Sequence, residues 1–182
     1  MSISPKPAIV ISMTDKVRPP LALFPELSAA QIKLVREDFA MIEKRSAISG
    51  LVFYRHLFTL DPSLKPLFHS GIEAQGRKLM EALEFTVATL DKPAELVPIL
   101  EALGRRHVTY GARTEHYTTM TEALVLTLRE SLGEGFSTAA EEAWRRALAF
   151  VCQAMLRGAA EVEHLKPDTG LETNPVALAA IR

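Results

Sequence analysis

The sequence predicts an all-α domain, and three observations support that prediction. Apolar residues recur at steps of three and four over most of the chain, which is the spacing of one helix face. Helix start signals, such as Ser28 with Gln31 and Asp61 followed by Pro62, bracket these periodic segments. No segment shows the convincing apolar–polar alternation of a half-buried strand. We therefore expect about six to eight helices.

Length and composition limit the class of protein. A chain of 182 residues with 48% hydrophobic content can bury one sizeable core. A net charge of -1 argues against a nucleic-acid partner. No apolar run approaches the roughly 20 residues of a membrane span, and Ala8–Ile11 is short for a signal sequence. The single cysteine, Cys152, excludes an internal disulfide. We expect a cytoplasmic monomer or homodimer with no membrane partner.

Proline content and periodicity divide the chain into three parts. Residues 1–26 contain five prolines, which forbid a long helix, so we expect an irregular N-terminal extension. Residues 27–163 carry the helical patterns and are predicted to form the domain. Periodicity fades over residues 164–182, where an irregular tail is expected.

The first half of the domain contains two long predicted helices and a short turn. Ser28 and Gln31 form a capping box, so the first helix begins there, and a second helix covers about 47–60. Asp61 then caps a helical turn that ends near Leu67. The buried stripe of the first helix is expected to be Ile32, Val35, Phe39 and Ile42.

Four more helices are predicted in the second half. The first covers about 73–90, and the next begins near Leu96, because Pro98 is tolerated only in a first turn. Gly111 ends that helix, and Thr114 opens another that stops at Gly133. The last helix is expected to begin with Thr138 and Glu141 as a second capping box and to end near Glu163.

One histidine lies on an apolar helix face. The stripe of Leu96, Ile99, Leu100 and Leu103 reaches His107 one turn later. A buried imidazole is most often a hydrogen-bonded core residue, and the carbonyl of Leu103 is the nearest expected acceptor. The alternative is that the second ring nitrogen binds a metal.

Further residues around this histidine and upstream of it form a recognisable set. They are Leu100–His107, Tyr110, His116, Tyr117, Gly50–Tyr54, Phe58, Asp61, Pro62, Leu67, Phe68 and Gln75. In this order and with these separations the sequence resembles globins, and it is most similar to bacterial single-domain globins and to the haem domain of flavohaemoglobins. The resemblance runs from about Leu27 to about Ala160. It implies a globin fold, with helices in a three-over-three arrangement around haem b (iron protoporphyrin IX).

The resemblance implies roles for particular residues. His107 matches the iron ligand, while Tyr54 and Gln75 match the distal residues that face a bound gas. Taken alone, Tyr54 could equally be a buried tyrosine bonded to backbone. Phe68 matches the phenylalanine that packs on the haem, and Lys78 could reach a propionate or remain a solvated lysine. The other residues expected at the cofactor are Leu79, Leu103, Arg106 and Tyr117, with Arg105 and Arg106 either at the second propionate or simply surface charges.

The main expected activity is reversible binding of dioxygen, with CO or NO as further ligands, at a pentacoordinate or weakly hexacoordinate iron. A first alternative is a nitric oxide dioxygenase or peroxidase-like enzyme that uses a separate reductase. The glutamate that backs the proximal histidine in flavohaemoglobins falls at Ala159 here, although Tyr117 matches its tyrosine partner. Glu161 lies on another helix face, so catalysis is expected to be weaker. A haem-based gas sensor and a domain that has lost haem are the remaining alternatives.

Overall fold

The computed structural model describes residues 24–68 and 71–163. Over these residues the chain forms six α-helices and two 3-10 helices and contains no strand, so the predicted all-α class is confirmed. His69, His164 and the predicted C-terminal tail lie outside the described residues. The elements are α1 (Ala29–Glu43), α2 (Ser46–Leu60), η2 (Pro62–Leu67), α3 (Ile72–Thr89), α4 (Pro93–Thr109), α5 (Thr114–Leu132), η3 (Gly133–Gly135) and α6 (Thr138–Glu163).

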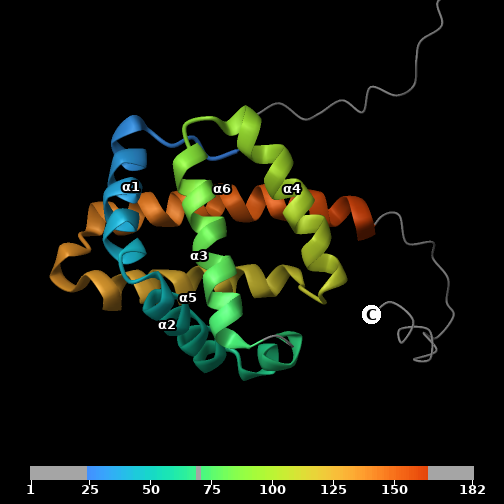
Figure 1. Ribbon diagram of the computed structural model, residues 1–182. Helices are drawn as coiled ribbons and strands as arrows, with labels where there is room; N and C mark the ends of the chain where they lie inside the picture. Colours follow the sequence, from blue (N-terminus) through green and yellow to red (C-terminus); the bar gives the residue numbers. More distant parts are fainter. Residues whose placement is uncertain (1–23, 69–70, 164–182) are drawn as a thin grey trace, which may run out of the picture.

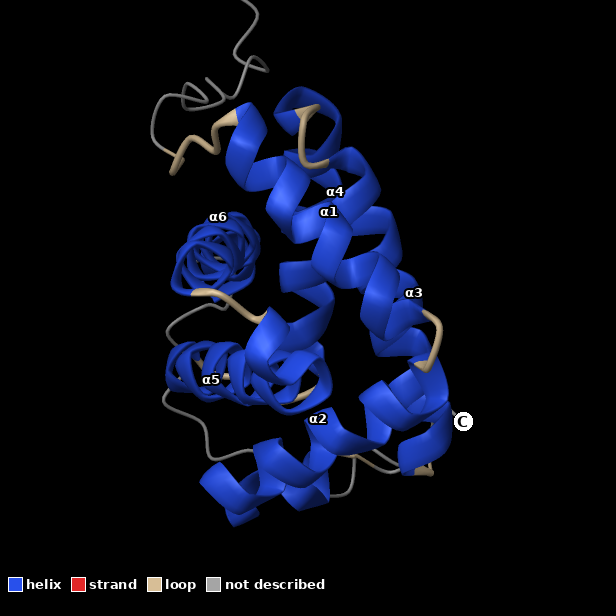
Figure 2. Ribbon diagram, turned by 90° about the vertical axis from the view of Figure 1, so that its left-hand side faces the viewer, coloured by secondary structure: helices blue, strands red, loops and turns tan. Residues whose placement is uncertain are grey.

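The helices form two layers. Figure 1 shows α1, α3 and α4 crossing in front of α5 and α6, and Figure 2 shows the same layers from the side, with α6 seen end-on. Helix α2 packs against both α3 and α5 and joins the layers at one end. When α2 is counted with α5, against which it packs, three helices lie over three (Figure 1), as the resemblance implied.

Local sequence signals set the ends of the first elements as predicted. The Ser28 side chain accepts from the Gln31 amide and the Gln31 side chain accepts from the Ser28 amide, which completes the capping box of α1. The Asp61 carboxylate caps η2 by accepting from the Ser63 amide at 3.0 Å. The predicted stripe of α1 is buried, and its members are Ile32, Val35, Phe39 and Ile42.

Glycine pairs allow two helix crossings to be very close. A Cβ atom on Gly50 of α2 would lie 2.7 Å from the Cα of Gly76 on α3. A Cβ on Gly104 of α4 would overlap with the main-chain carbonyl of Met155 on α6, and one on Gly158 would overlap with that of Glu101. These backbones can approach only because glycine has no side chain.

Three sequence predictions about helices are wrong. Helix α4 begins at Pro93 rather than near Leu96, because Pro93 fills the first position and Pro98 removes only one backbone donor without ending the helix. Ile99 is 44% exposed, since the buried face of α4 is turned toward α6. The residue that caps α6 is Ser137, whose hydroxyl accepts from the Ala140 amide at 3.1 Å, whereas Thr138 is already helical.

The described chain begins inside the predicted N-terminal extension. Phe24 is buried, and its ring centroid lies 5.4 Å from that of Phe150 on α6. The carbonyl of Glu26 accepts a hydrogen bond from Arg146 Nε at 2.5 Å. The expected domain limits at 27 and 163 stay a prediction. Among the described helices, none combines the length and the apolar character needed to cross a bilayer.

Candidate functional site

His107 lies in the last turn of α4 and is held by its own helix. Its Nδ1 is 2.9 Å from the carbonyl oxygen of Leu103, which is the acceptor expected from the sequence. A carbonyl can only accept, so Nδ1 carries the proton and Nε2 keeps its lone pair. Nε2, the nitrogen that keeps its lone pair, therefore points away from the backbone of α4.

The imidazole is in the protonation state that a metal requires. Burial lowers the pKa of His107 below its usual value. The hydrogen bond to Leu103 raises the pKa, but by less than burial lowers it. The nearby guanidinium of Arg106 lowers the pKa further. His107 is therefore neutral near pH 7, which is the form that coordinates iron.

Tyr54 lies in a cluster of aromatic side chains on α2 and η2. The tyrosine is 6% exposed, and its ring centroid lies 5.1 Å from that of Phe68 in an edge-to-face arrangement. Phe53 and Phe58 complete the cluster, at 5.1 and 5.7 Å from Tyr54. Burial raises the pKa of Tyr54 to about 12, so its hydroxyl remains protonated and can donate a hydrogen bond.

Gln75 and His107 lie at the same end of a helix pair. Helices α3 and α4 are joined by a short turn at residues 90–92 and diverge from it (Figure 1). Gln75 lies in the first turn of α3 and His107 in the last turn of α4, so both lie far from the connecting turn. Gln75 is half-buried, and the next residue, Gly76, contacts α2 at Gly50.

The side chains around this end suit an apolar, planar cofactor with acidic edges. Leu79, Leu83, Leu103 and Phe68 pack against the core on one side but remain only partly buried. Apolar surface is thus left on the same elements that carry His107 and Gln75. No hydrogen bond to His107 Nε2 is found among the described residues, and α3 and α4 carry partly buried leucines, so these residues fit a haem group.

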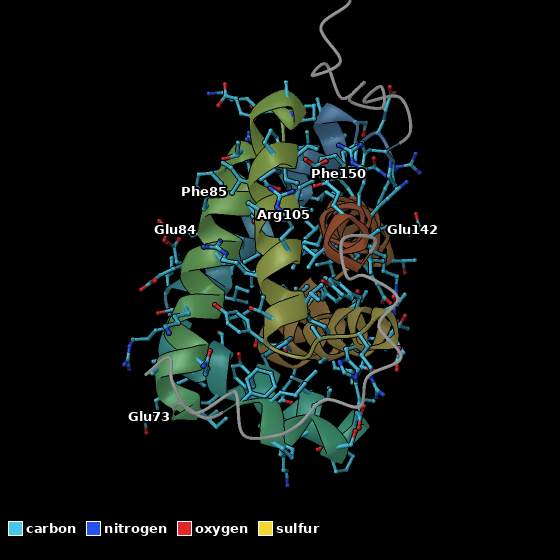
Figure 3. The ribbon with its side chains drawn as sticks, turned by 90° about the vertical axis from the view of Figure 1, so that its right-hand side faces the viewer. Glu73, Glu84, Phe85, Arg105, Glu142 and Phe150 are labelled. Atoms are coloured by element: carbon cyan, nitrogen blue, oxygen red, sulfur yellow. The ribbon has the colours of Figure 1, made fainter. Side chains whose placement is uncertain are left out.

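Two of the expected cations remain exposed, and a third is already paired. Lys78 and Arg106 are exposed, and neither has an ion pair among the described residues. Arg105, labelled in Figure 3, instead pairs with Glu161 of α6 at 2.9 Å, which favours a structural role for Arg105. Of the two roles that the sequence left open for Arg105, this ion pair favours a surface charge over a partner for a propionate.

The residues expected behind His107 lack the carboxylate of the flavohaemoglobin pattern, as the sequence indicated. Tyr117 is 6% exposed on α5, and its carbonyl accepts from the Thr121 hydroxyl at 2.9 Å. Ala159 is buried, so no carboxylate stands at that position. Glu161 faces Arg105, which agrees with its expected place on another face of α6. Cys152 is partly buried beside Thr121.

Sequence reasoning missed the contacts between α4 and α6. Glu101 and Arg157 form a largely buried ion pair, and the guanidinium of Arg157 lies 4.7 Å from the ring centroid of Phe24. Gly104 and Gly158 could have indicated this contact from the sequence, because a glycine in the middle of a helix often marks close approach of another backbone. A shallow surface hollow lies elsewhere, lined by Ala29, Ile32, Lys33, Arg36, Glu37 and Asp91.

Known proteins similar to this chain include a neuroglobin and several flavohemoproteins. Neuroglobin of Danio rerio is 29% identical over 147 residues, covering 73% of this chain and 92% of neuroglobin. Flavohemoproteins of Chromobacterium violaceum and Vibrio cholerae are 28% and 27% identical, each over 71% of this chain. The chain spans about a third of the length of these flavohemoproteins, at 33% and 34%.

A solved structure agrees with these relatives. It is an engineered carbene transferase from a Rhodothermus marinus protein described as a nitric oxide dioxygenase, with a TM-score of 0.69 and 27% identity. The match covers 76% of this chain and 97% of that one. The Globin family model matches residues 51–155, which is more than half of the chain. With the all-α architecture and the position of His107, these matches show that the chain belongs to the globin family and is a haem globin.

Proposed function

We propose that the protein reversibly binds dioxygen, and also CO or NO, at a haem b whose iron is held by His107. The observation that carries the proposal is the 2.9 Å contact between His107 Nδ1 and the Leu103 carbonyl. Because Nδ1 donates its proton to that carbonyl, Nε2 keeps the lone pair that can bind iron, and the hydrogen bond restrains the ring. A fixed ring with a neutral imidazole is what an axial ligand of haem iron requires.

Bound haem would supply an iron with an open position for a diatomic gas. Tyr54 would donate its hydroxyl proton to that gas, because burial keeps the hydroxyl protonated up to a pKa of about 12. The side-chain amide of Gln75 would donate a second hydrogen bond. Each bond would contribute roughly 1–1.5 kcal/mol, so the pair would slow release about 30- to 150-fold.

The remaining site residues would hold the cofactor. Phe68, Leu79 and Leu103 would contact the macrocycle, and each has apolar surface beyond its core contacts. Lys78 and Arg106 would pair with the two propionates, since both are exposed cations on α3 and α4. Tyr117 would pack on the His107 side from α5, where its side chain is buried.

A spectrum of the purified protein mixed with haemin tests the proposal. Wild type should show a Soret band, and in the ferrous state the band of a histidine-bound iron. His107→Ala should lose that ferrous signature, while His116→Ala in the first turn of α5, whose ring contacts Arg113, should keep it. The proposal is overturned if wild type shows no Soret band or if His107→Ala leaves the spectrum unchanged.

A second candidate function is nitric oxide dioxygenation, in which NO, O2 and one electron from a separate reductase give nitrate. The names of the flavohemoprotein relatives and of the Rhodothermus structure favour it. Ala159 and the engaged Glu161 count against it, because neither offers a free carboxylate behind His107. With oxygen and an added reductase that keeps re-reducing the iron, the protein should consume many NO molecules per haem if this function holds, and only about one per haem if it does not.

A further inference from the structure

We propose that the crossing of α4 and α6 positions His107, with Glu101 and Arg157 as the positioning residues. The inference rests on the proposed function, because it concerns the placement of the iron ligand. Neither residue would touch haem in this account. Both would act through the backbone of α4, which carries Leu103 and His107.

Helix α4 is held mainly by α6. It crosses α6 and packs mainly against it (Figure 1), and it meets α3 only weakly, although α3 is its neighbour in the chain. At the centre of that interface the two backbones touch, Gly104 against Met155 and Gly158 against Glu101. The position of α4, and with it His107, therefore depends chiefly on how α4 sits on α6.

Two ion pairs lie beside this backbone contact. In one the acidic residue is on α4, and in the other it is on α6. Glu101 of α4 pairs with Arg157 of α6, through Arg157 Nε at 2.6 Å and also through Nη2. One turn later on both helices, Arg105 of α4 pairs with Glu161 of α6 at 2.9 Å. The negative and positive ends thus alternate along both helices.

This alternation specifies the register of α4 on α6. Sliding α4 one helical turn in one direction would bring Arg105 opposite Arg157, and sliding it in the other direction would bring Glu101 opposite Glu161. Both alternatives place like charges together, which is unfavourable at a protected interface. One turn is about 5.4 Å along the helix axis, a displacement that would move His107 away from any fixed cofactor.

The inner pair should matter more than the outer pair. The side chains of Glu101 and Arg157 are 9% and 22% exposed, against 39% and 42% for Arg105 and Glu161. Arg157 Nη1 is buried and has no hydrogen-bond partner among the described residues. The charge of this guanidinium is balanced by Glu101, which contacts its other nitrogens. Removing either member would leave the other charge poorly solvated.

The orientation of the His107 ring follows from this position. The Leu103 carbonyl that holds Nδ1 lies between Glu101 and Arg105 in the sequence of α4. The direction of Nε2 is therefore fixed relative to the α4 backbone, and the backbone is fixed relative to α6. A looser crossing should appear as a weaker or more variable bond between iron and histidine.

The test compares haem-loaded wild type with Glu101→Gln and Arg157→Lys. Each variant should shift or broaden the iron–histidine stretching band of the ferrous protein in resonance Raman spectra. Each should also release haem to an excess apoprotein acceptor about tenfold faster or more, as when groups that orient a metal ligand are removed. Glu122→Gln is the matched control, because it breaks an ion pair between α5 and α6 with Arg145 that does not involve α4.

The inference is overturned if Glu101→Gln and Arg157→Lys keep the wild-type band and release haem within about twofold of the wild-type rate, however much they lower stability. If Glu101→Gln does not fold, Arg157→Lys and the exposed outer variant Arg105→Ala decide, with a smaller effect in the same direction expected for Arg105→Ala. Failure of the proposed function looks different. In that case wild type itself lacks the iron–histidine band, or His107→Ala retains it.

Discussion

The two helix crossings that carry the candidate ligands are built differently. On the His107 side, α4 and α6 touch through backbone at Gly104 and Gly158, and ion pairs flank the contact. On the Tyr54 side, α2 and α3 meet at Gly50 and Gly76, while aromatic rings fill the space beside them. The first crossing is specified by backbone and charge, and the second by side-chain shape. We expect the first to tolerate added volume poorly and the second to be sensitive to single polar atoms.

The largest expected effect is that of Gly104→Ala. Its Cβ would overlap with the Met155 carbonyl, and a rigid helix backbone cannot yield as a side chain can. We expect the free energy of unfolding to fall by about 3 kcal/mol or more, at the upper end of overpacking effects. Urea denaturation of the apoprotein measures it.

Two further glycines provide the comparison for that measurement. Gly50→Ala should cost less than Gly104→Ala, because its Cβ would lie 2.7 Å from Gly76 Cα rather than overlapping an atom. Gly135→Ala should be nearly neutral, since nothing lies within 4 Å of a Cβ there. An equal loss of stability at Gly104 and Gly50 would remove the difference between the two crossings.

The next largest effect is an alkaline loss of stability caused by Tyr54. Its pKa is about 12 in the folded protein against 10.0 ordinarily, so the unfolded chain releases the proton first as pH rises. Below pH 10 the tyrosine gives no pH dependence, and between about 10 and 12 stability should fall by about 2–3 kcal/mol. Tyr54→Phe should lack this component when unfolding is followed from pH 9 to pH 12. A wild type that loses no more stability than Tyr54→Phe would contradict the assigned burial.

Sequence patterns predicted what depends on neighbours along the chain. The Ser28–Gln31 capping box, the Asp61 cap and the Leu103 acceptor for His107 all involve residues at most four positions apart. The buried stripe of α1 followed from the helix period alone. Such features need no knowledge of which helix packs against which.

The errors and omissions depend on tertiary partners. Ile99 shares the helix period with Leu96, but the direction in which α6 lies decides that Ile99 is exposed. The pairing of Glu101 with Arg157 joins residues 56 positions apart, and no local pattern specifies it. Roles for Tyr54, Gln75 and Phe68 came from family resemblance, because a buried tyrosine or phenylalanine alone fits any core.

A third, smaller effect concerns the polar atoms of the distal side. Tyr54→Phe should speed dioxygen release about tenfold, because one hydrogen bond worth roughly 1–1.5 kcal/mol is lost while the ring packing remains. Stopped-flow displacement of oxygen by CO measures the rate. Thr127→Val is the control, since it removes a buried hydroxyl that donates to the Ala123 carbonyl within α5 and is not assigned to the site. If both variants speed release alike, Tyr54 has no special place beside the bound gas.

The smallest effect is expected at the exposed cations, and it separates the cofactor edge from both crossings. Lys78→Ala and Arg106→Ala should each speed haem loss only about two- to fivefold, because solvent-exposed ion pairs are weak. Added salt should reduce the difference in haem-loss rate between these variants and wild type, since screening already weakens such ion pairs at an ionic strength of about 0.15 M. Lys33→Ala on α1 is the control, being an equally exposed lysine paired with Glu37. If Lys78→Ala and Arg106→Ala match Lys33→Ala in haem loss at low salt, then apolar contact and His107 hold the cofactor without help from charge.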